Sequence, residues 1–274
     1  MEKERFEWLS LARHMAAEAG VLIRSASESA RSEGVGKEKS CSVDLVTEYD
    51  RQAEDIILSK IRDRYPDHGI ISEESNPKGE LKKVTWVVDP IDGTTNFIAG
   101  LPEVAVSIGI IVDGKPEVGV VYNPIRNEIF HAVRGCGAFL DDRPIRVNEG
   151  ITLSQAIVCV EFGYVRTNEG AVTMLEPVRK LLNRSVRTIR MIGSGALDLC
   201  FVACGRLDAV YAGIAGEGWY PWDYAAGGLI AEEAGAKLCK VDGSEFSIFG
   251  DSVVCSSPSI VGDILEVIKP ESQS

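Results

Sequence analysis

The sequence predicts a mixed fold of the α+β or layered α/β class, on three observations. Two segments near the N-terminus carry apolar residues at helical spacing, and the segments over residues 104–140 are typical of an antiparallel meander. Beyond them, helix-like and strand-like patterns mix without strict βαβ alternation. With 274 residues, 45% of them apolar, the chain can bury a sizeable core in one large domain or two closely packed ones.

Helices are predicted where apolar residues recur every three or four positions. The predicted ranges are 4–27, about 48–64, 169–183, 194–204, 223–234 and a short segment at the C-terminus. Residues 32–42 are polar and contain glycine, so they predict a loop between the first two helices. The turn at Tyr65-Pro66-Asp67-His68-Gly69 should end the second helix.

Strands are predicted where short apolar runs lie between turn residues. The predicted strands are 70–71, 84–88, 104–112, 118–122, 128–133, 156–160, 207–211, about 236–241 and 252–255. The strand at 84–88 should be buried, and Pro90 should end it because proline cannot donate a hydrogen bond to a central ladder. A turn-rich stretch is expected before Gly150.

The charge balance restricts the classes of partner. Formal net charge is −12, from 41 acidic and 29 basic residues, which argues against general binding to nucleic acid or to an anionic membrane. Divalent metals would let such a chain bind a phosphate ester. The charged N-terminus and the absence of a long apolar span predict neither a secretory signal nor a membrane anchor. Seven cysteines without a Cys-x-x-Cys motif predict free thiols in the cytoplasm.

Acidic residues gather in three short clusters and at one distant position. These are residues 44–50 (DLVTEYD), Glu73-Glu74, residues 89–94 (DPIDGT) and Asp223. Asp89 follows an apolar strand directly, and Asp92 follows a tight turn, so both carboxylates should emerge at a strand end. With the carbonyl oxygen of Ile91 they form a set of hard oxygen donors, which magnesium prefers. Two metals about 3.5–4 Å apart can clamp a phosphoryl group.

Each cluster also has a simpler interpretation. An Asp-Gly pair after a strand is typical of a plain turn, and adjacent glutamates are commonly a solvated pair. Thr47 and Asp50 match a capping box at a helix N-terminus, and Asp223 suits the first turn of a helix. The Gly93 position allows a close backbone approach to a phosphate, whose oxygens would meet the N–H groups of Gly93 and Thr94.

Taken together, the segments resemble the inositol monophosphatase family of magnesium-dependent, lithium-sensitive phosphomonoesterases. Four ordered motifs carry the resemblance: DLVTEYD at 44–50, SEES at 72–75, WVVDPIDGTTNF at 86–97 and WDYAA at 222–226. It covers about residues 8–258. It implies one catalytic unit over residues 1–274, with approximate halves 1–150 (metal-binding) and 151–274, a layered αβαβα sandwich, and usually a homodimer.

The resemblance also implies a role for each motif residue. Two or three magnesium ions would be held by Glu73, Asp89, the carbonyl oxygen of Ile91, Asp92 and Asp223. The catalytic residues would be Glu73 and Thr94, which orient and activate the attacking water, and Asp50, which hydrogen-bonds Thr94. The magnesium-activated water would attack phosphorus directly, without a phospho-enzyme. The substrate would contact Asp92, Gly93, Thr94, Gly193, Ser194, Gly195, Glu217 and Asp223.

One segment departs from the family pattern. The family usually places a glutamate shortly before its Trp-Asp pair, where it binds substrate hydroxyls. Here the corresponding segment, 211–222, is longer by several residues and rich in glycine. Glu217 is the candidate for that role, and it equally suits a solvent-exposed loop. Trp219 and Tyr220 are candidates for a different pocket wall.

Three hypotheses for function therefore stand. The first is hydrolysis of myo-inositol monophosphate, a small phosphate monoester. The second is hydrolysis of another sugar phosphate, such as fructose 1,6-bisphosphate or galactose 1-phosphate. The third is a regulatory binding protein with vestigial activity. The intact set of Glu73, Asp89, Asp92, Thr94 and Asp223 argues against the third.

Overall fold

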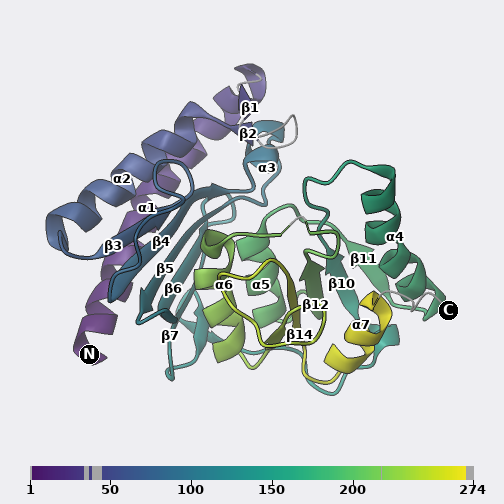
Figure 1. The fold of residues 1–274 in the computed structure, drawn as a ribbon. Helices are drawn as coiled ribbons and strands as arrows, with labels where there is room; N and C mark the ends of the chain where they lie inside the picture. The colour runs from purple at the N-terminus through teal and green to yellow at the C-terminus, as the bar shows by residue number, and fades with distance from the viewer. Residues whose placement is uncertain (1, 34–36, 39–44, 217, 270–274) are drawn as a thin grey trace.

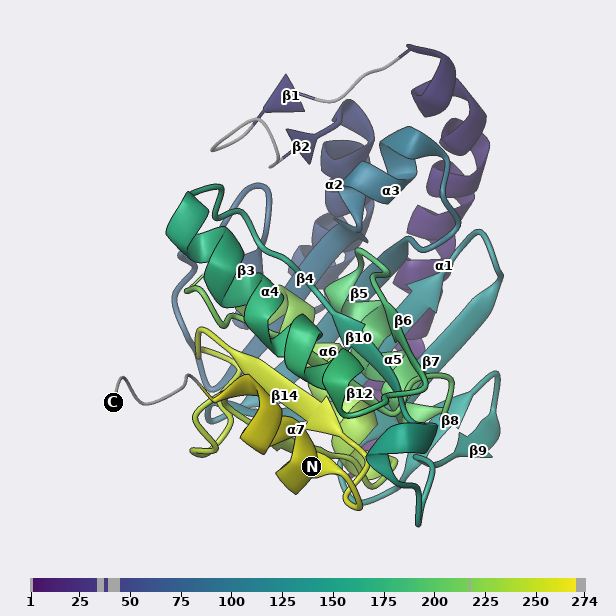
Figure 2. The same cartoon turned by 90° about the vertical axis from the view of Figure 1, so that its right-hand side faces the viewer.

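Five alternating layers of helices and sheets make up the protein. The computed structural model describes residues 2–33, 37–38, 45–216 and 218–269. Helices α1 (Glu2–Glu33) and α2 (Glu48–Arg64) cover one face of a seven-stranded sheet, and α5 (Gly195–Ala203) and α6 (Pro221–Glu233) lie between this sheet and a five-stranded one (Figures 1 and 2). Helices α4 (Asn168–Asn183) and α7 (Val261–Ile268) cover the far face of the second sheet. The expected αβαβα sandwich is confirmed.

The seven-stranded sheet is mostly an antiparallel meander. Its strands, in spatial order, are β3 (Gly69–Ser72), β4 (Val84–Asp92), β5 (Ala105–Val112), β6 (Lys115–Asn123), β7 (Glu128–Val133), β8 (Ala138–Leu140) and β9 (Arg143–Ile145). Only β3 and β4 pair in parallel among these neighbours. The meander was predicted as far as β7, but β8 and β9 were not named as strands, because both are short and lie in a sequence rich in turn residues.

The five-stranded sheet has a mixed topology. Its spatial order is β11 (Thr188–Arg190), β10 (Ile157–Val160), β12 (Ala209–Ala212), β14 (Val253–Ser256) and β13 (Lys237–Cys239). Strand β10 pairs in parallel with both β11 and β12, so the segments that follow β10 and β12 leave the sheet at the same edge. Strand β11 has three residues and was not predicted.

The side chains of strand β4 alternate between the two faces of the sheet, and this alternation continues from the core into the site. Trp86 and Val88 pack with α1 and α2, whereas Val87 packs with α5 and α6 on the opposite face. Asp89 continues the alternation on the α6 face. A charged side chain thus enters the layer between the two sheets.

The prediction that Pro90 ends this strand was wrong. Strand β4 continues to Asp92, with Asp89 opposite Ser107 and Asp92 opposite Ala105. Two residues, Pro90 and Ile91, therefore face a single residue of β5. Such a β-bulge leaves the extra residue out of the ladder, so the missing N–H of proline costs no sheet hydrogen bond.

The region between the first two helices also differs from its prediction. Helix α1 extends to Glu33, into the range predicted as a loop, and β1 (Lys37–Glu38) pairs with β2 (Leu45–Val46). Residues 34–36 and 39–44 of this region lie outside the described part of the chain. A short helix, α3 (Thr94–Ala99), follows Gly93, and a 3-10 turn spans Leu153–Gln155. Among the described residues, no helix is long and apolar enough to cross a membrane.

Candidate active site

The β-bulge in β4 determines the backbone conformation at the site. The carboxylate oxygen Oδ1 of Asp89 accepts a hydrogen bond from the N–H of Ile91 at 3.0 Å, which closes the turn around Pro90. Gly93 follows with a φ of +87°, and a Cβ atom there would lie 2.8 Å from the carbonyl oxygen of Glu103. The left-handed backbone and the close contact both require glycine at this position.

Three aspartates meet at this point. Carboxylate oxygens of Asp89, Asp92 and Asp223 all lie within 4.8 Å of one another, although Asp223 comes from α6, more than a hundred residues later. Asp223 occupies the first turn of α6, and its Oδ2 accepts a hydrogen bond from the N–H of Tyr220 at 2.7 Å. The side chains of Asp89 and Asp92 are buried. The fold thus concentrates negative charge where water cannot disperse it.

The pKa values of the buried aspartates reflect this concentration. Burial, and then the charges of Glu73, Asp92 and Asp223, raise the pKa of Asp89 well above its ordinary range. Burial also raises the pKa of Asp92 to about 6, although hydrogen bonds from Ser194, Ala196 and Gly195 oppose the shift. Carboxylates in this state need either a proton or a cation. Several hard oxygen donors converging on one point suit magnesium, so the residues fit the expected metal.

The N-terminus of α5 holds Asp92. The Ser194 hydroxyl donates to Oδ2 of Asp92 at 2.6 Å, and the N–H of Ala196 donates to the same oxygen at 2.8 Å. The N–H of Gly195 donates to Oδ1 at 3.2 Å. A helix N-terminus favours an anion because its first N–H groups lack partners within the helix. These bonds join the first sheet to the helix layer and bring residues 193–195 to the acidic cluster.

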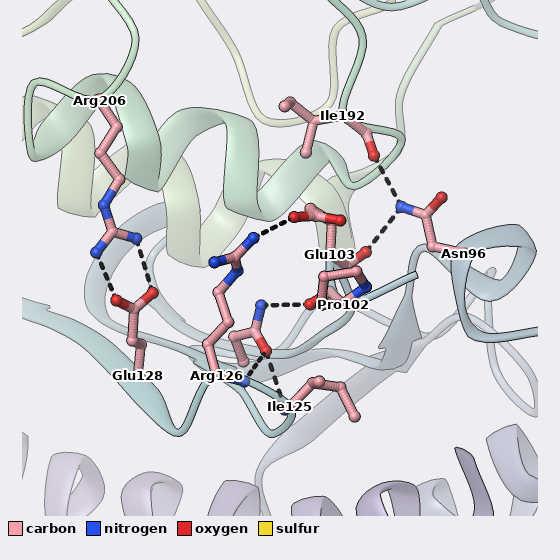
Figure 3. A network of polar contacts seen from close by, with 9 residues as sticks. Asn96, Pro102, Glu103, Ile125, Arg126, Glu128, Ile192 and Arg206 are labelled. Carbon is pink, nitrogen blue, oxygen red and sulfur yellow. Dashed lines mark hydrogen bonds and ion pairs between the residues drawn. The ribbon is translucent and has the colours of Figure 1, made fainter. Parts of the chain in front are cut away.

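Two side chains that were not predicted hold the segment before α5. Asn96 of α3 donates from Nδ2 to the carbonyl oxygens of Glu103 and Ile192, both at 2.8 Å (Figure 3). From the other side, Oε1 of Glu161 accepts the N–H groups of Ile192 at 2.7 Å and of Gly193 at 2.9 Å. Asn96 lies inside the motif at 86–97, and Glu161 follows an apolar run just as Asp89 does, so both carried a signal.

The expected hydrogen bond between Thr94 and Asp50 is present. The Thr94 hydroxyl lies 3.2 Å from Oδ1 of Asp50 and 3.2 Å from the carbonyl oxygen of Ile91. The other oxygen of Asp50 accepts a hydrogen bond from the N–H of Thr47 at 2.7 Å and completes the capping box of α2. Both interpretations of Asp50 are therefore correct. One side chain starts a helix and orients the threonine hydroxyl.

Glu73 approaches the cluster from the end of β3. Its N–H donates to the carbonyl oxygen of Val88 at 3.1 Å, and it lies close enough to Asp89 to raise the pKa of that carboxyl by charge and by a hydrogen bond. Buried Glu54 accepts the N–H groups of Glu74 at 3.1 Å and Ser75 at 3.2 Å, and so holds the turn. Glu54 lies in the middle of a predicted helix, where the sequence offers no signal of this role.

A cavity of about 630 Å³ opens over these groups. Its acidic and polar lining contains Glu73, Asp89, Ile91, Asp92, Gly93, Thr94, Gly193, Ser194, Gly195 and Asp223. Every predicted metal and substrate residue within the described chain is thus brought to one cavity. Asp50 acts from behind Thr94, and Glu217 lies outside the described residues. The arrangement offers carboxylates for cations, N–H groups for a phosphate and a positioned hydroxyl.

A second cluster of possible metal ligands includes Glu161, which also lines the cavity. Cys159, Glu161 and Asp198 also place one ligand atom each within 4.8 Å of the others. Burial raises the pKa of the Asp198 carboxyl and of the Cys159 thiol well above their ordinary values, which favours the protonated forms. Since Glu161 already accepts two backbone N–H groups, we interpret this cluster as support for the segment before α5.

Comparisons with known proteins agree with this geometry. A model of the inositol monophosphatase family matches residues 4–271. Inositol monophosphatase 1 of Solanum lycopersicum is 42% identical over 231 residues, which cover 83% of each chain. The Nus factor SuhB of Pasteurella multocida is 40% identical over 263 residues, 96% of each chain. The crystal structure of extragenic suppressor protein suhB from Bartonella henselae has a TM-score of 0.87 at 31% identity, and covers 97% of this chain and 100% of that one.

Proposed function

Because the chain belongs to the inositol monophosphatase family, we propose that it hydrolyses myo-inositol monophosphate to inositol and inorganic phosphate with the help of magnesium. Membership of the family supports phosphatase activity. The observation that carries the proposal is the convergence of Asp89, Asp92 and Asp223 within 4.8 Å in a cavity that Thr94 also lines. Three carboxylates without a basic side chain among them have a clear chemical use if they bind divalent cations.

The proposed metal ligands are Glu73, Asp89, the carbonyl oxygen of Ile91, Asp92 and Asp223, for two or three ions. When bound, magnesium would neutralise charge on the phosphoryl group and lower the pKa of water. The protein prepares these ligands in advance. Asp92 is held by α5 and Asp223 by its own helix turn, so their positions do not depend on the cation.

The remaining groups would position the reactants. We propose that Thr94, oriented by Asp50, aligns the attacking water, and that Glu73 takes its proton. The N–H groups of Gly93 and Thr94 begin a helix whose N-terminus faces the cavity, where a phosphate would be stabilised. The alcohol half would then lie toward Gly193, Ser194 and Gly195, on the far side of Asp92. This arrangement supports direct in-line attack on phosphorus.

The two other hypotheses for function concern the same site. Other sugar phosphates, fructose 1,6-bisphosphate or galactose 1-phosphate, present the same phosphoryl group and differ only in the alcohol. A regulatory role receives some support because relatives at about 40% identity are named Nus factor. The complete acidic set favours the enzyme. We also retain a homodimer and a cytoplasmic location as predictions.

The decisive experiment is a substrate panel. Release of inorganic phosphate would be measured with magnesium from myo-inositol 1-phosphate, fructose 1,6-bisphosphate and galactose 1-phosphate. We expect the highest kcat/KM for the inositol ester. Asp223→Asn is the negative control, because it keeps the shape of the side chain and removes its charge. Release from no ester would overturn the enzymatic proposal, and a preference for another sugar phosphate would replace the substrate.

A further inference from the structure

We infer that the loop between β13 and β14, residues 240–252, positions one wall of the cavity, and that its Phe246 is a positioning residue for the alcohol half of the substrate. The residues of this loop, all within the described chain, do not themselves line the cavity. The inference rests on the proposed phosphatase function. It concerns the glycine-rich segment 211–222, whose described residues in the lining are Gly218, Trp219, Tyr220 and Trp222.

Trp219 lies beside the part of the site proposed for the alcohol. An added Cβ at Gly195 would be 3.1 Å from the indole ring of Trp219, so the ring lies directly against this backbone. The N–H of Gly195 donates to Oδ1 of Asp92 at 3.2 Å. A shift of the indole ring would therefore change the space for the alcohol, whereas the phosphoryl position proposed at the start of α3 would remain.

A row of aromatic rings connects Trp219 to the loop. The ring centroids of Trp219 and Tyr224 are 5.8 Å apart, and those of Tyr224 and Phe246 are 5.3 Å apart with the planes at 82°. Edge-to-face contacts at such separations are favourable. The ring of Phe246 also lies against α6, where an added Cβ at Gly228 would be 3.6 Å from it. Phe246 thus supports the ring that contacts the cavity wall.

The backbone of the loop supports the same segment at a second point. Gly213 has a φ of +87°, and an added Cβ there would overlap the carbonyl oxygen of Asp251. An added Cβ at Gly218 would lie only 2.9 Å from the same oxygen. Both positions therefore require glycine in this arrangement. Two glycines of the segment rest on one carbonyl group of the loop.

The loop has contacts that hold it independently of the segment it supports. The N–H of Lys240 donates to the carbonyl oxygen of Ser244 at 3.0 Å, and that of Gly250 donates to the carbonyl oxygen of Ser247 at 2.9 Å. The side chain of Ile248 is buried in the core between the two sheets. A loop fixed in this way can determine where the segment before α6 lies.

A different route from Phe246 to the site would pass through the metal ligands. Tyr224 follows Asp223 directly, and Asp223 accepts the N–H of Tyr220 at 2.7 Å. A displacement of Tyr224 could then disturb magnesium binding instead of the space for the alcohol. The two routes predict different results: the first changes KM for a large alcohol, and the second changes the magnesium concentration that gives half of the maximal activity.

The test compares two esters that differ in the size of the alcohol. The larger is the preferred ester of the substrate panel, expected to be myo-inositol 1-phosphate, and the smaller is glycerol 2-phosphate. We expect Phe246→Ala to raise KM for the larger ester about threefold to tenfold, in the range for loss of one aromatic contact. Its kcat, both constants of the smaller ester and the magnesium requirement should remain within about twofold of the wild type.

Two further variants serve as controls. Phe246→Met keeps an apolar side chain against Tyr224 and should restore the wild-type KM, because a thioether also packs well on an aromatic ring. Phe139→Ala removes another half-buried ring, which stacks on His131 outside the cavity, and should leave KM for both esters unchanged.

The possible outcomes separate this inference from the proposed function. If the wild type hydrolyses neither ester, the proposed function fails and the inference fails with it. If both esters are hydrolysed and Phe246→Ala keeps the wild-type KM, the inference alone is wrong. An equal loss on both esters, or a higher magnesium requirement, would also overturn it. Should Phe246→Ala fail to fold, Gly218→Ala provides the same test, because its methyl group would meet the backbone of Asp251. The same selective rise in KM is expected, and its absence would refute the positioning role of the loop.

Discussion

Replacement of Asn96 by alanine tests whether a side chain next to the first sheet positions the segment before α5. Asn96 is buried, and its Nδ2 donates to the carbonyl oxygens of Glu103 and Ile192 at 2.8 Å. The alanine leaves both carbonyl groups without this donor. It removes no group proposed to touch the substrate or a metal, so any loss of activity reports the position of the segment before α5.

The expected loss of stability follows from these two bonds. A buried carbonyl left without its donor costs about 1–3 kcal/mol, and because both of these bonds are only partly buried, the lower part of that range applies to each, so Asn96→Ala should lower the free energy of unfolding by about 2–4 kcal/mol. For a chain of this length that corresponds to a fall in Tm of about 5–10 °C. A displacement of the 192–195 segment by about 1 Å should reduce kcat/KM by about tenfold to a hundredfold.

Asn123→Ala provides the matched control. Asn123 is also buried, donates to the carbonyl oxygen of Pro102 at 2.9 Å, and accepts the N–H groups of Ile125 and Arg126. It has no contact of this kind with the 192–193 segment. Both variants would be compared by thermal unfolding and by phosphate release well below either Tm. Equal kcat/KM in the two variants, despite equal destabilisation, would refute the positioning role of Asn96.

Further predictions follow from the acidic cluster and from a partly buried histidine, His68. Asp92→Asn and Asp223→Asn should each lower the rate of phosphate release more than about a hundredfold. Asp113→Asn, in an exposed turn, is the control and should leave the rate unchanged. Near-normal activity of the Asp92 or the Asp223 variant would contradict the assignment of these residues as metal ligands. Removal of divalent cations should abolish turnover, and magnesium should restore it. Lithium should inhibit by competition with magnesium, and insensitivity at high lithium would count against the assignment. His68 accepts a hydrogen bond from Trp86 at 3.0 Å, and burial lowers the pKa of His68 below its ordinary value. As pH falls, the imidazole of His68 therefore takes up a proton in the unfolded state before it does so in the folded state. The contribution of His68 to the free energy of unfolding should be fully present above about pH 6.5 and decrease below it. Thermal unfolding from pH 8 to pH 5 would measure this decrease, and His68→Gln should flatten it.

Most helices were predictable because their signals are local. The apolar spacing of α2 and the capping box at Thr47 and Asp50 lie within one segment, and the predicted range of 48–64 matches the observed helix. Short strands were less predictable. Strand β11 has three residues, and its identity as a strand depends on pairing with β10. Pairing of this kind is a property of the sheet and leaves little trace in three residues.

The residues of the site also divide into those with a local signal in the sequence and those without one. The motif at 86–97 indicated Asp89, Asp92 and Thr94 through its resemblance to the family pattern, because taken alone the same residues are typical of a turn at a strand end. The bulge at Pro90 was predicted as a strand end, since the sequence does not show that two residues can face one across the ladder. Glu54 gave no signal, because a glutamate within an amphipathic helix is ordinary and only its burial against the turn after Glu73 is informative.

By itself, the sequence determined the acidic chemistry, the family and the layered fold. The acidic chemistry and the family rest on short contiguous motifs, and the layered fold was implied by the resemblance that these motifs carry. The tertiary structure decided how the parts meet: Asp92 is held by the N-terminus of α5, residues 192–193 are held by Asn96 and Glu161, and the acidic residues from distant segments line one cavity. The contacts of Asp92 and Asn96 join segments 104 and 96 residues apart, and those of Glu161 join segments 31 and 32 residues apart. They depend on how two sheets pack against one helix layer, and local propensity contains no information on that packing.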